Sequence, residues 1–220
     1  MATGPKALIV RGGWEGHSPA ATGQWCAQLL GEAGYQVTVS GSLDSYLDAG
    51  LLAATDLVVQ CWTMGRLSAG QSAGLRTAVR AGTGFAGWHG GIVDAFREDT
   101  DYQLLTGGQF VYHPQEFVSY QVTPTAAGAS HPALAGIGLY RVTTEQYYVH
   151  TAPGVEVLAV TEFAEDQDQP QLAGTVVPVT WAQRWGAGRV FVTTVGHRLA
   201  DLTVPEVTAT IRQGMVWATR

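Results

Sequence analysis

The sequence of 220 residues has few charged side chains, two cysteines and no long hydrophobic segment. Charged residues are 14% of the chain and the formal net charge is −6, which argues against a nucleic-acid or membrane-surface partner, since both favour a basic patch. No stretch approaches the roughly 18 consecutive apolar residues that span a bilayer, and the apolar run near the N-terminus is too short for a signal peptide. Cys26 and Cys61 each lie within an apolar pattern, which does not indicate a disulfide framework. We therefore expect a cytoplasmic protein whose partner is a small molecule.

Apolar residues are plentiful, at 46%, and the chain shows no internal repeat or low-complexity tract. That supply is sufficient for one large hydrophobic core. We predict a single domain over residues 1–220, and the sequence leaves open whether this domain forms a homo-oligomer.

The first half of the chain alternates short apolar runs with amphipathic segments. Runs at 6–10, 35–40 and 56–62 are typical of strands, and the last is apolar enough to be covered on both faces. Segments 20–33 and 68–81 repeat apolar residues at helical spacing, and a glycine follows each of them. Strand, helix and strand in close succession predict parallel strands joined by right-handed crossovers.

From about Gly108 the pattern becomes β-rich. Residues 189–195 are typical of one more core strand, and residues 205–218 of a closing helix. We therefore predict a three-layer α/β fold: a flavodoxin-like, doubly wound, mostly parallel sheet with β-rich antiparallel additions in the second half. Ligands of such sheets bind beyond the carboxyl ends of the strands, so the segments that follow each strand are the candidates for a site.

The segment GTGFAGWHGGIVDAF, residues 82–96, is the most unusual of these. A buried strand ends near Ala86, and the chain turns through the sequence GWHGG, with His89 at its centre, before a helical pattern begins. Hydrolases display a serine or cysteine nucleophile on a turn of this kind. Here the displayed residue is a histidine.

A family resemblance rests on five segments in the same order: GTGFAGWHGG, LLTGGQFVYHP, SHPALAGI, TEQYYVH and VPVTWAQRWGAGRVFVTTVGH. Together they resemble the ThuA-like (trehalose-utilisation) family, whose fold is similar to that of class I glutamine amidotransferases. The resemblance covers nearly the whole chain. It implies bacterial carbohydrate metabolism, with disaccharides such as trehalose or their keto derivatives as the substrate class.

The same resemblance implies that this chain lacks catalytic residues of the amidotransferases. The amidotransferase turn has the form G-x-C-x-G, and His89 stands at the position of its nucleophilic cysteine. Gly196-His197 resembles the pair that contains the catalytic histidine, but Leu199 occupies the place of the supporting acid. Glutaminase activity is therefore not expected. Cys61 is a less favoured alternative nucleophile, because it ends a buried strand with no basic residue near it in the sequence.

Our candidates for proton transfer are His89, Glu145 and His197. His89 precedes a predicted helix, whose positive end disfavours the imidazolium, so we expect a neutral ring near pH 7. Glu145 is close to Tyr147 and Tyr148, and partial desolvation would raise its pKa toward the range useful for proton transfer. His197 ends a strand at the same predicted edge. Each of the three also has an alternative structural role, in holding a turn, facing solvent or capping.

A divalent metal such as zinc is the cofactor that these residue types favour, since catalytic zinc takes three ligands of this kind. No compact pair such as H-x-x-x-H occurs. Glu145 and His150 are separated by five residues, which places them on opposite faces of a regular strand. A structural role is favoured for His131, and no nucleotide cofactor is expected. The candidate metal ligands are a subset of His17, His89, His113, Glu145 and His150.

Aromatic residues after strands favour a carbohydrate ligand, because such rings stack on sugars while their polar atoms donate hydrogen bonds. We expect an enzyme, a lyase, isomerase or hydrolase without a cysteine nucleophile, that acts on a sugar or keto-sugar by acid–base chemistry with or without a metal. The alternative is a non-catalytic sugar-binding or regulatory module. The amides of Gly90 and Gly91 are expected to stabilise an enediolate or alkoxide. The substrate-binding candidates are Trp14, His17, Trp62, Trp88, Gly90, Gly91 and Tyr147.

Overall fold

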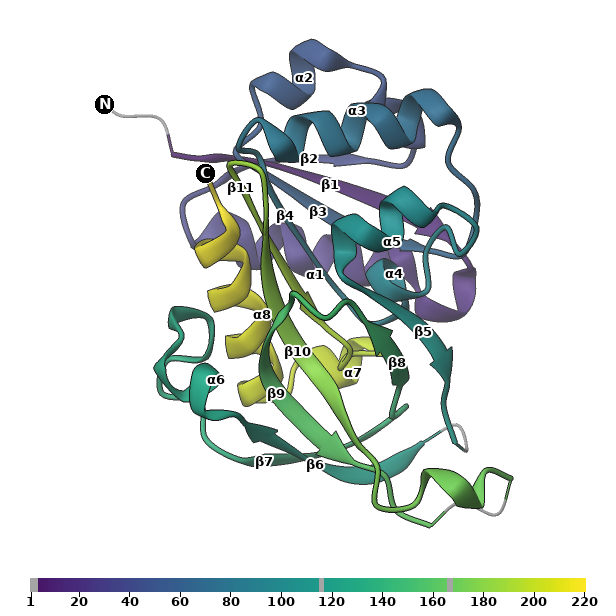
Figure 1. The fold of residues 1–220 in the computed structure, drawn as a ribbon. Helices are drawn as coiled ribbons and strands as arrows, with labels where there is room; N and C mark the ends of the chain where they lie inside the picture. Colours follow the sequence, from purple (N-terminus) through teal and green to yellow (C-terminus); the bar gives the residue numbers. More distant parts are fainter. Residues whose placement is uncertain (1–3, 115–116, 166–167) are drawn as a thin grey trace.

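The computed structural model describes residues 4–114, 117–165 and 168–220. In this part of the chain a nine-stranded sheet has the order β2-β1-β3-β4-β11-β10-β9-β6-β7 (Figure 1). The first five strands in that order are parallel neighbours, and they include every core strand that the sequence predicts. Their bounds are β2 (Gln36–Ser40), β1 (Lys6–Gly13), β3 (Leu57–Thr63), β4 (Gly84–Trp88) and β11 (Gly188–Thr193).

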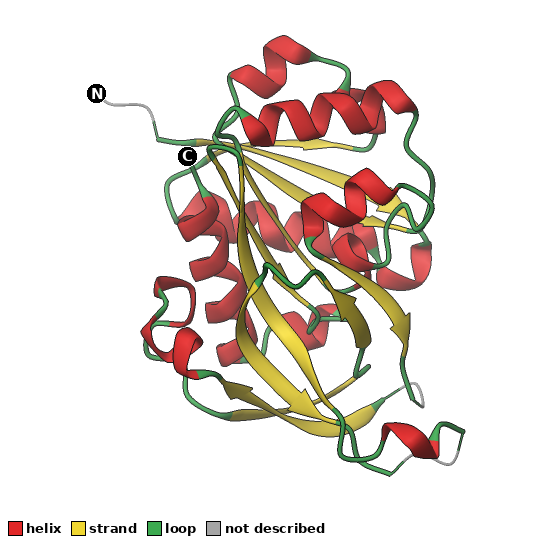
Figure 2. Ribbon diagram, in the orientation of Figure 1, coloured by secondary structure: helices red, strands yellow, loops and turns green. Residues whose placement is uncertain are grey.

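The other four strands continue the sheet in antiparallel fashion (Figure 2). Two further strands, β5 (Gly108–Tyr112) and β8 (Tyr148–Thr151), pair with each other as a separate antiparallel sheet. The antiparallel strands of the large sheet are β10 (Val176–Trp185), β9 (Glu156–Glu162), β6 (Val118–Pro124) and β7 (Tyr140–Thr144).

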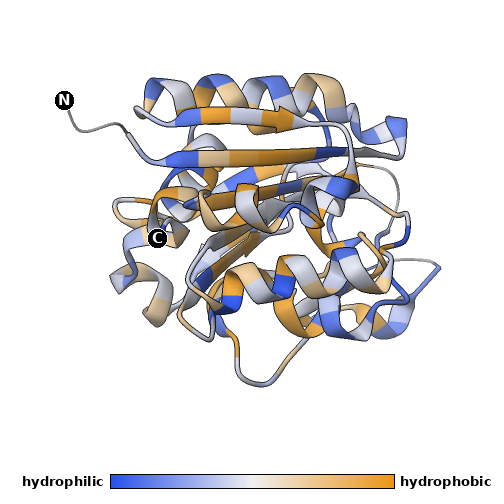
Figure 3. Cartoon of the chain, turned by 90° about the horizontal axis from the view of Figure 1, so that it is seen from above, coloured by the Kyte–Doolittle hydropathy of each residue, from blue (hydrophilic) through white to orange (hydrophobic). Residues whose placement is uncertain are grey.

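Helices cover both faces of the sheet, and Figure 3 shows hydrophobic stretches of strand lying between them. In β1, Ala7 and Ile9 pack in the core on one face, while Leu8 and Val10 pack in the core on the other. This alternation follows from the two-residue period of a strand, and burial of both faces explains the continuous apolar runs. The first face carries α1 (Pro19–Glu32) and α8 (Pro205–Ala218); the second carries α2 (Ala49–Ala53), α3 (Ala69–Arg80) and α5 (Thr100–Thr106).

The remaining helical elements are short. They complete the connections between strands, and several of them lie close to the carboxyl ends of the parallel strands. They are α4 (Gly90–Val93), α6 (Ala126–Ser130), α7 (Leu199–Leu202) and 3-10 turns at Glu15–His17, Leu43–Tyr46, Pro132–Leu134 and Pro170–Leu172.

The predicted three-layer α/β fold is confirmed by this arrangement. The predicted closing helix is α8, and α3 begins at a reciprocal cap in which Ser68 and Gln71 each bond the other's main-chain N–H. A helix does begin after His89, as predicted, but it is short. It stops after the single turn α4, and α5 begins only at Thr100.

Among the described residues, no helix combines the length and the apolar character that crossing a membrane requires.

Candidate active site

The turn after β4 holds His89 in a strained backbone conformation. Its φ of 49° and ψ of −147° lie where residues with a Cβ are rare. Its main-chain N–H donates to the carbonyl of Thr193 (2.7 Å), and its ring Nδ1 lies 2.8 Å from the carbonyl oxygen of Thr194. A carbonyl only accepts, so Nδ1 carries the hydrogen and the other ring nitrogen, Nε2, is directed into the protein.

Four buried side chains meet beyond the carboxyl ends of the parallel strands. One potential ligand atom from each of His17, His89, Glu145 and His197 lies within 4.8 Å of those of the others. Glu145 Oε2 is 3.0 Å from His89 Nε2 and 3.1 Å from His197 Nδ1. His89 is 1% exposed, whereas His17, Glu145 and His197 keep 9, 5 and 7%, so solvent still reaches the group. We call these four residues the His–Glu cluster.

Each member of the cluster comes from a different connection. The three histidines follow β1, β4 and β11, which end at one edge of the parallel sheet. Glu145 instead lies between β7 and β8, in the antiparallel half. Its main-chain carbonyl accepts a hydrogen bond from the Tyr120 hydroxyl (3.1 Å), and the adjacent Gln146 donates to Thr161 Oγ1 (2.8 Å). These bonds fix the carboxylate against the histidines.

Gly90 allows His17 to approach the turn. A Cβ at this position would lie 2.3 Å from His17 Cε1 and 3.1 Å from the Tyr147 hydroxyl oxygen. At Gly91 a Cβ would lie 3.2 Å from Cys61 Cα, so this glycine brings α4 close to β3. The structure thus gives both glycines a packing role, and substrate binding by their amides stays a prediction.

Aromatic side chains surround the cluster. The Tyr147 ring stacks on His89 with centroids 4.0 Å apart, and Phe117 contacts the ring of His197 at 5.4 Å. Trp14 is 46% exposed and meets His17 edge-on, with centroids 4.8 Å apart. His113 Nε2 lies 3.8 Å from Glu145 Oε1. Trp14 and His113 are therefore the neighbours most accessible to a ligand.

Burial sets the charge states of the cluster. It lowers the pKa of His17 to about 3, and the neighbouring His89 and His197 contribute to that shift. Burial also lowers the pKa of His89, although Glu145 opposes the change. Burial alone would raise the pKa of Glu145, but His197 and His89 together outweigh it, and the net pKa lies well below its usual range. Near pH 7 His17 and His89 are therefore neutral, and Glu145 is charged.

Two of the predicted electrostatic arguments need correction. His89 is neutral because it is buried, since α4 has only four residues and cannot supply a large helix dipole. The predicted rise in the pKa of Glu145 is wrong in direction, because imidazoles contact its carboxylate. Along the chain, by contrast, the nearby titratable residues are Tyr147 and Tyr148.

Three other predicted residues are not members of the cluster, although Trp88 lines the same small cavity as His17 and His89. Trp88 is 3% exposed and packs in the core against Trp25, so it offers no free ring face to a sugar. Trp62 packs on the opposite face of the sheet from Cys61, against the core beneath α3. His150 is exposed on β8 and is not a member of the four-residue group. Glu145 lies in the connection before β8, so the two residues do not share one strand and the predicted alternation does not apply to them.

Cys61 does have basic neighbours in space, contrary to the expectation from the sequence. It lines a cavity of about 10 Å³ together with His17 and His89, a volume close to that of one water molecule. Its Sγ lies 3.4 Å from Thr22 Oγ1. Burial nevertheless raises the pKa of the thiol to about 11, so Cys61 is protonated and is a poor nucleophile.

Sequence reasoning missed Thr63 and Thr194, whose oxygen atoms orient two rings of the cluster. His17 Nδ1 lies 2.8 Å from Thr63 Oγ1, and His89 Nδ1 bonds the carbonyl of Thr194. Both threonines stand at the carboxyl ends of predicted strands, and that position is the signal that could have identified them.

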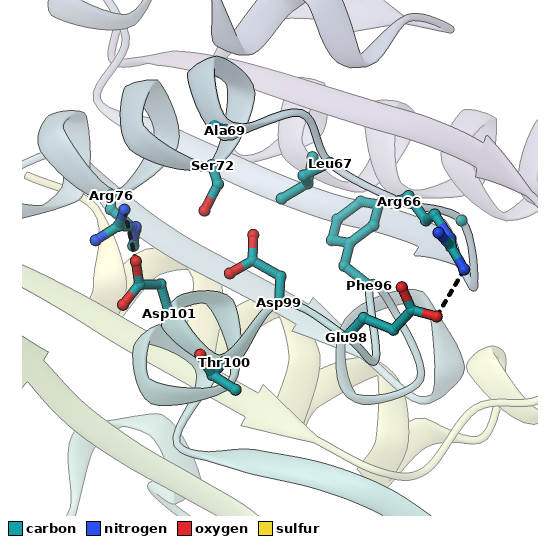
Figure 4. A pocket seen from close by; sticks show the side chains of 11 residues that line it. Arg66, Leu67, Ala69, Ser72, Arg76, Phe96, Glu98, Asp99, Thr100 and Asp101 are labelled. Atoms are coloured by element: carbon teal, nitrogen blue, oxygen red, sulfur yellow. Dashed lines mark hydrogen bonds and ion pairs between the residues drawn. The ribbon is translucent and has the colours of Figure 1, made fainter.

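A larger cavity, of about 440 Å³, lies between the starts of α3 and α5 (Figure 4). Four of its charged side chains form ion pairs, Arg66 with Glu98 at 2.7 Å and Arg76 with Asp101 at 2.8 Å, and Asp99 accepts a hydrogen bond from the main-chain N–H of Tyr102. None of the cluster residues lines it. We therefore place the candidate active site at the His–Glu cluster, where titratable groups contact each other out of bulk solvent.

Fold and site together define a class: an α/β protein in which a buried histidine stands on the strand–turn–helix connection after β4 and contacts a carboxylate. A family model described as trehalose utilisation, ThuA, matches residues 6–218. The chain belongs to this family, and the resemblance read from the sequence is confirmed.

Solved structures share the fold at low sequence identity. A ThuA-like protein from Parabacteroides merdae ATCC 43184 has 15% identity and a TM-score of 0.82, over 98% of this chain and 90% of that one. A cytoplasmic protein from Salmonella typhimurium LT2 has 12% identity and a TM-score of 0.67, over 98% and 100%. A β-galactosidase from Bacillus circulans sp. alkalophilus has 13% identity and a TM-score of 0.61, over 99% of this chain but 30% of the enzyme. A comparison with curated proteins gives no match.

Proposed function

We propose that the protein is an enzyme of carbohydrate metabolism that acts on a sugar or keto-sugar by proton transfer at Glu145. The observation that carries this proposal is the set of side chains that contact the buried carboxylate of Glu145. His89, His197 and His113 lie 3.0, 3.1 and 3.8 Å from its oxygens. In the described part of the chain its ion-pair partners are imidazoles, side chains that can both accept and donate a proton, whereas lysine and arginine stay charged.

Membership of the ThuA family supports the substrate class, since that family is described by trehalose utilisation. The fold also forms part of a β-galactosidase, an enzyme named for its action on a glycoside. The exposed Trp14 beside the cluster supplies a ring on which a sugar can stack. A trehalose-type disaccharide or its keto derivative is thus the ligand class that we propose.

The reaction we propose begins with removal of a proton from the carbon next to a carbonyl. The C–H bond breaks, the proton passes to the Glu145 carboxylate, and the electron pair moves onto the carbonyl oxygen as an enediolate. An imidazole of the cluster orients that oxygen. Where the deprotonated carbon bears a hydroxyl, an imidazole moves the proton of that hydroxyl to the former carbonyl oxygen, and Glu145 returns its proton to the former carbonyl carbon, which completes an isomerisation. Where the next carbon bears a leaving group, the carbonyl re-forms, a C=C bond forms as the bond to the leaving group breaks, and the group departs with the proton held by Glu145, which completes an elimination.

We also propose that the protein works in the cytoplasm. Cys26 and Cys61 are both free and buried, which suits a reducing compartment. The Salmonella protein of similar fold is described as cytoplasmic.

Exchange of carbon-bound hydrogen tests the proposal without knowledge of the final product. A panel of trehalose, glucose disaccharides and their oxidised keto forms is incubated with the protein in D₂O and followed by NMR. We expect deuterium to enter next to the carbonyl of at least one keto-sugar. The Glu145→Gln variant is expected to slow this exchange by about 10²- to 10⁴-fold, and the matched control His150→Ala to leave it unchanged.

A non-catalytic sugar-binding module is the competing function. It is favoured if a sugar of the panel binds to the wild type, measured by calorimetry, but no member of the panel exchanges hydrogen or is converted. Equal exchange rates in the wild type and in Glu145→Gln would likewise contradict the proposed role of the carboxylate.

A further inference from the structure

The two ring nitrogens of His89 have fixed roles. Nδ1 donates to the carbonyl oxygen of Thr194, 2.8 Å away, so Nε2 carries a hydrogen only when the ring is a charged imidazolium. Nε2 lies 3.0 Å from Glu145 Oε2. In the neutral ring, a nitrogen lone pair therefore faces a carboxylate oxygen. Two acceptors at this distance repel each other unless a proton or a metal ion lies between them.

His17 and His197 each also have a ring nitrogen close to the Glu145 carboxylate. His17 Nδ1 bonds Thr63 Oγ1 at 2.8 Å, which leaves Nε2 as its second ring nitrogen. His197 Nδ1 is buried, lies 3.1 Å from Glu145 Oε2 and has no hydrogen-bond partner of good geometry among the described residues. A ring held through one nitrogen by a protein oxygen, with the second nitrogen unused, is the usual arrangement of a metal-ligating histidine.

The spacing of the cluster suits a single ion. The ring centroids of His17 and His89 are 4.9 Å apart, those of His17 and His197 are 4.8 Å apart, and those of His89 and His197 are 5.4 Å apart. With Glu145 included, one ligand atom from each residue lies within 4.8 Å of the others. Tetrahedral zinc with bonds of about 2.1 Å separates its ligand atoms by about 3.4 Å, so small side-chain rotations are sufficient to close the site.

We propose that His17, His89, His197 and Glu145 bind one divalent transition-metal ion of the zinc type. Three imidazoles with one carboxylate favour such ions over calcium or magnesium, which prefer oxygen ligands. The inference rests on the proposed function and deepens it, since a bound ion would polarise the sugar carbonyl. Glu145 Oε1 faces His113 Nε2 at 3.8 Å and remains available to take the proton. The metal set predicted from the sequence thereby gains His197 and loses His113 and His150.

Metal binding can be measured without any substrate. The full chain is stripped with a chelator, dialysed, and titrated with ZnCl₂ in competition with a chromophoric chelator. We expect one zinc ion per chain. Titration with CoCl₂ should give the intense visible bands of four- or five-coordinate cobalt. Binding of less than a tenth of an equivalent of zinc, or a cobalt spectrum no different from that of the free aqueous ion, overturns the inference.

Variants identify the ligands. Replacement of an outer partner of a metal-bound histidine typically costs 10- to 100-fold in affinity, so we expect about that loss for Thr63→Val and at least about 100-fold for His17→Ala or His197→Ala. His150→Ala is the matched control, because His150 is an exposed histidine outside the cluster, and it should bind zinc like the wild type. Equal affinities in His17→Ala, His197→Ala and the control would overturn the inference.

Two safeguards keep the test decisive. Circular dichroism establishes that each variant is folded, and if a ligand variant is unfolded, the cobalt spectrum of the wild type decides alone. The inference and the proposed function fail separately. Deuterium exchange by a protein that binds no metal contradicts only the metal site, whereas zinc binding without exchange on any sugar contradicts only the catalytic function.

Discussion

The two ends of the parallel strands use their charges differently. At the amino end, Asp56 accepts hydrogen bonds from the main-chain N–H of Lys6 (2.8 Å) and from the guanidinium of Arg220 (3.0 Å). The Asp56 and Arg220 side chains are 26 and 40% exposed. At the carboxyl end, Glu145 is buried and faces imidazoles that are themselves buried. A partly exposed ion pair therefore lies at the amino end of the strands, whereas buried titratable groups lie at the carboxyl end.

The backbone shows the same contrast. In the described ranges, the non-glycine residues with positive φ are Ser18, Met64, His89 and Phe96. Ser18 follows His17, Met64 follows β3 and His89 follows β4, while Phe96 donates its N–H to the carbonyl of Met64 (3.3 Å). Strain of this kind persists where the surrounding structure over-determines it, and here it gathers at the end that holds the cluster.

The same chemical change at the two ends should have different consequences for activity. Glu145→Gln and Asp56→Asn each replace a carboxylate by an amide. We expect hydrogen exchange on a keto-sugar to fall by about 10²- to 10⁴-fold in the first variant and to stay at the wild-type rate in the second. A comparable loss in both variants would show that the two ends are not functionally distinct.

Added volume should be tolerated far from the cluster and not within it. Gly90→Ala places a methyl group against His17, so we expect a loss of about 1–3 kcal/mol in the free energy of unfolding. Gly31 is the matched control. It lies in α1, where an added Cβ would meet nothing within 4 Å, and Gly31→Ala should stabilise the protein by about 0.5–1 kcal/mol. Urea denaturation measures both, and equal stability of the two variants would contradict the packing role of Gly90.

Stability should fall in mild acid because of the histidines. The pKa of His17 in the folded protein, about 3, lies below that of an unfolded histidine, about 6.5. Between these values the unfolded chain binds more protons, so stability is complete above about pH 6.5 and is lost as the pH falls. The slope for one such histidine approaches about 1.4 kcal/mol per pH unit.

Urea denaturation of metal-free protein between pH 7.5 and 4.5 measures this slope. His17→Gln should flatten it, provided that the variant is folded at pH 7.5. Asp56 is the contrasting group. Its pKa is lowered by the Lys6 N–H and by Arg220, so its contribution is present above about pH 4 and is lost only in stronger acid. A slope that is the same in His17→Gln and in the wild type would contradict the buried, neutral state of His17.

The smallest effect is expected at the exposed ion pair. Arg220→Met removes the guanidinium that bonds Asp56, and pairs of this exposure contribute about 0–1 kcal/mol. Thermal unfolding should show a small decrease that shrinks further in high salt, with no change in zinc binding. A loss of several kcal/mol would mean that the amino end depends on this pair far more than its exposure indicates.

Most of the central fold could be predicted because its signals are local. Continuous apolar runs indicated strands covered on both faces, and helical spacing located α1, α3 and α8 within a residue or two. The short helix α4 and the separate β5–β8 sheet could not be predicted in this way. Gly91 of α4 lies close to Cys61 of β3, a contact between distant segments, and β5 and β8 are separated along the chain by β6 and β7, which belong to the large sheet.

The candidate site, too, could be predicted from the sequence only in part. His17, His89 and His197 could be placed at one edge because each follows a predicted parallel strand. Trp62 and Trp88 were equally close to strand ends, but both rings pack against the hydrophobic core, Trp62 on one face of the sheet and Trp88 on the other. The charge state of Glu145 was beyond reach, because it depends on contacts with His89, 56 residues away in the chain.

By itself, the sequence determined the family, the layered architecture and the presence of a histidine on a strained turn, since these follow from periodicity, glycine placement and short motifs. Only the tertiary structure decided that a carboxylate from the antiparallel half reaches the three imidazoles of the parallel half. It also decided which ring nitrogen of His89 is held by a carbonyl. Long-range packing sets both, because hydrogen-bond partners and burial are properties of groups brought together from distant parts of the chain.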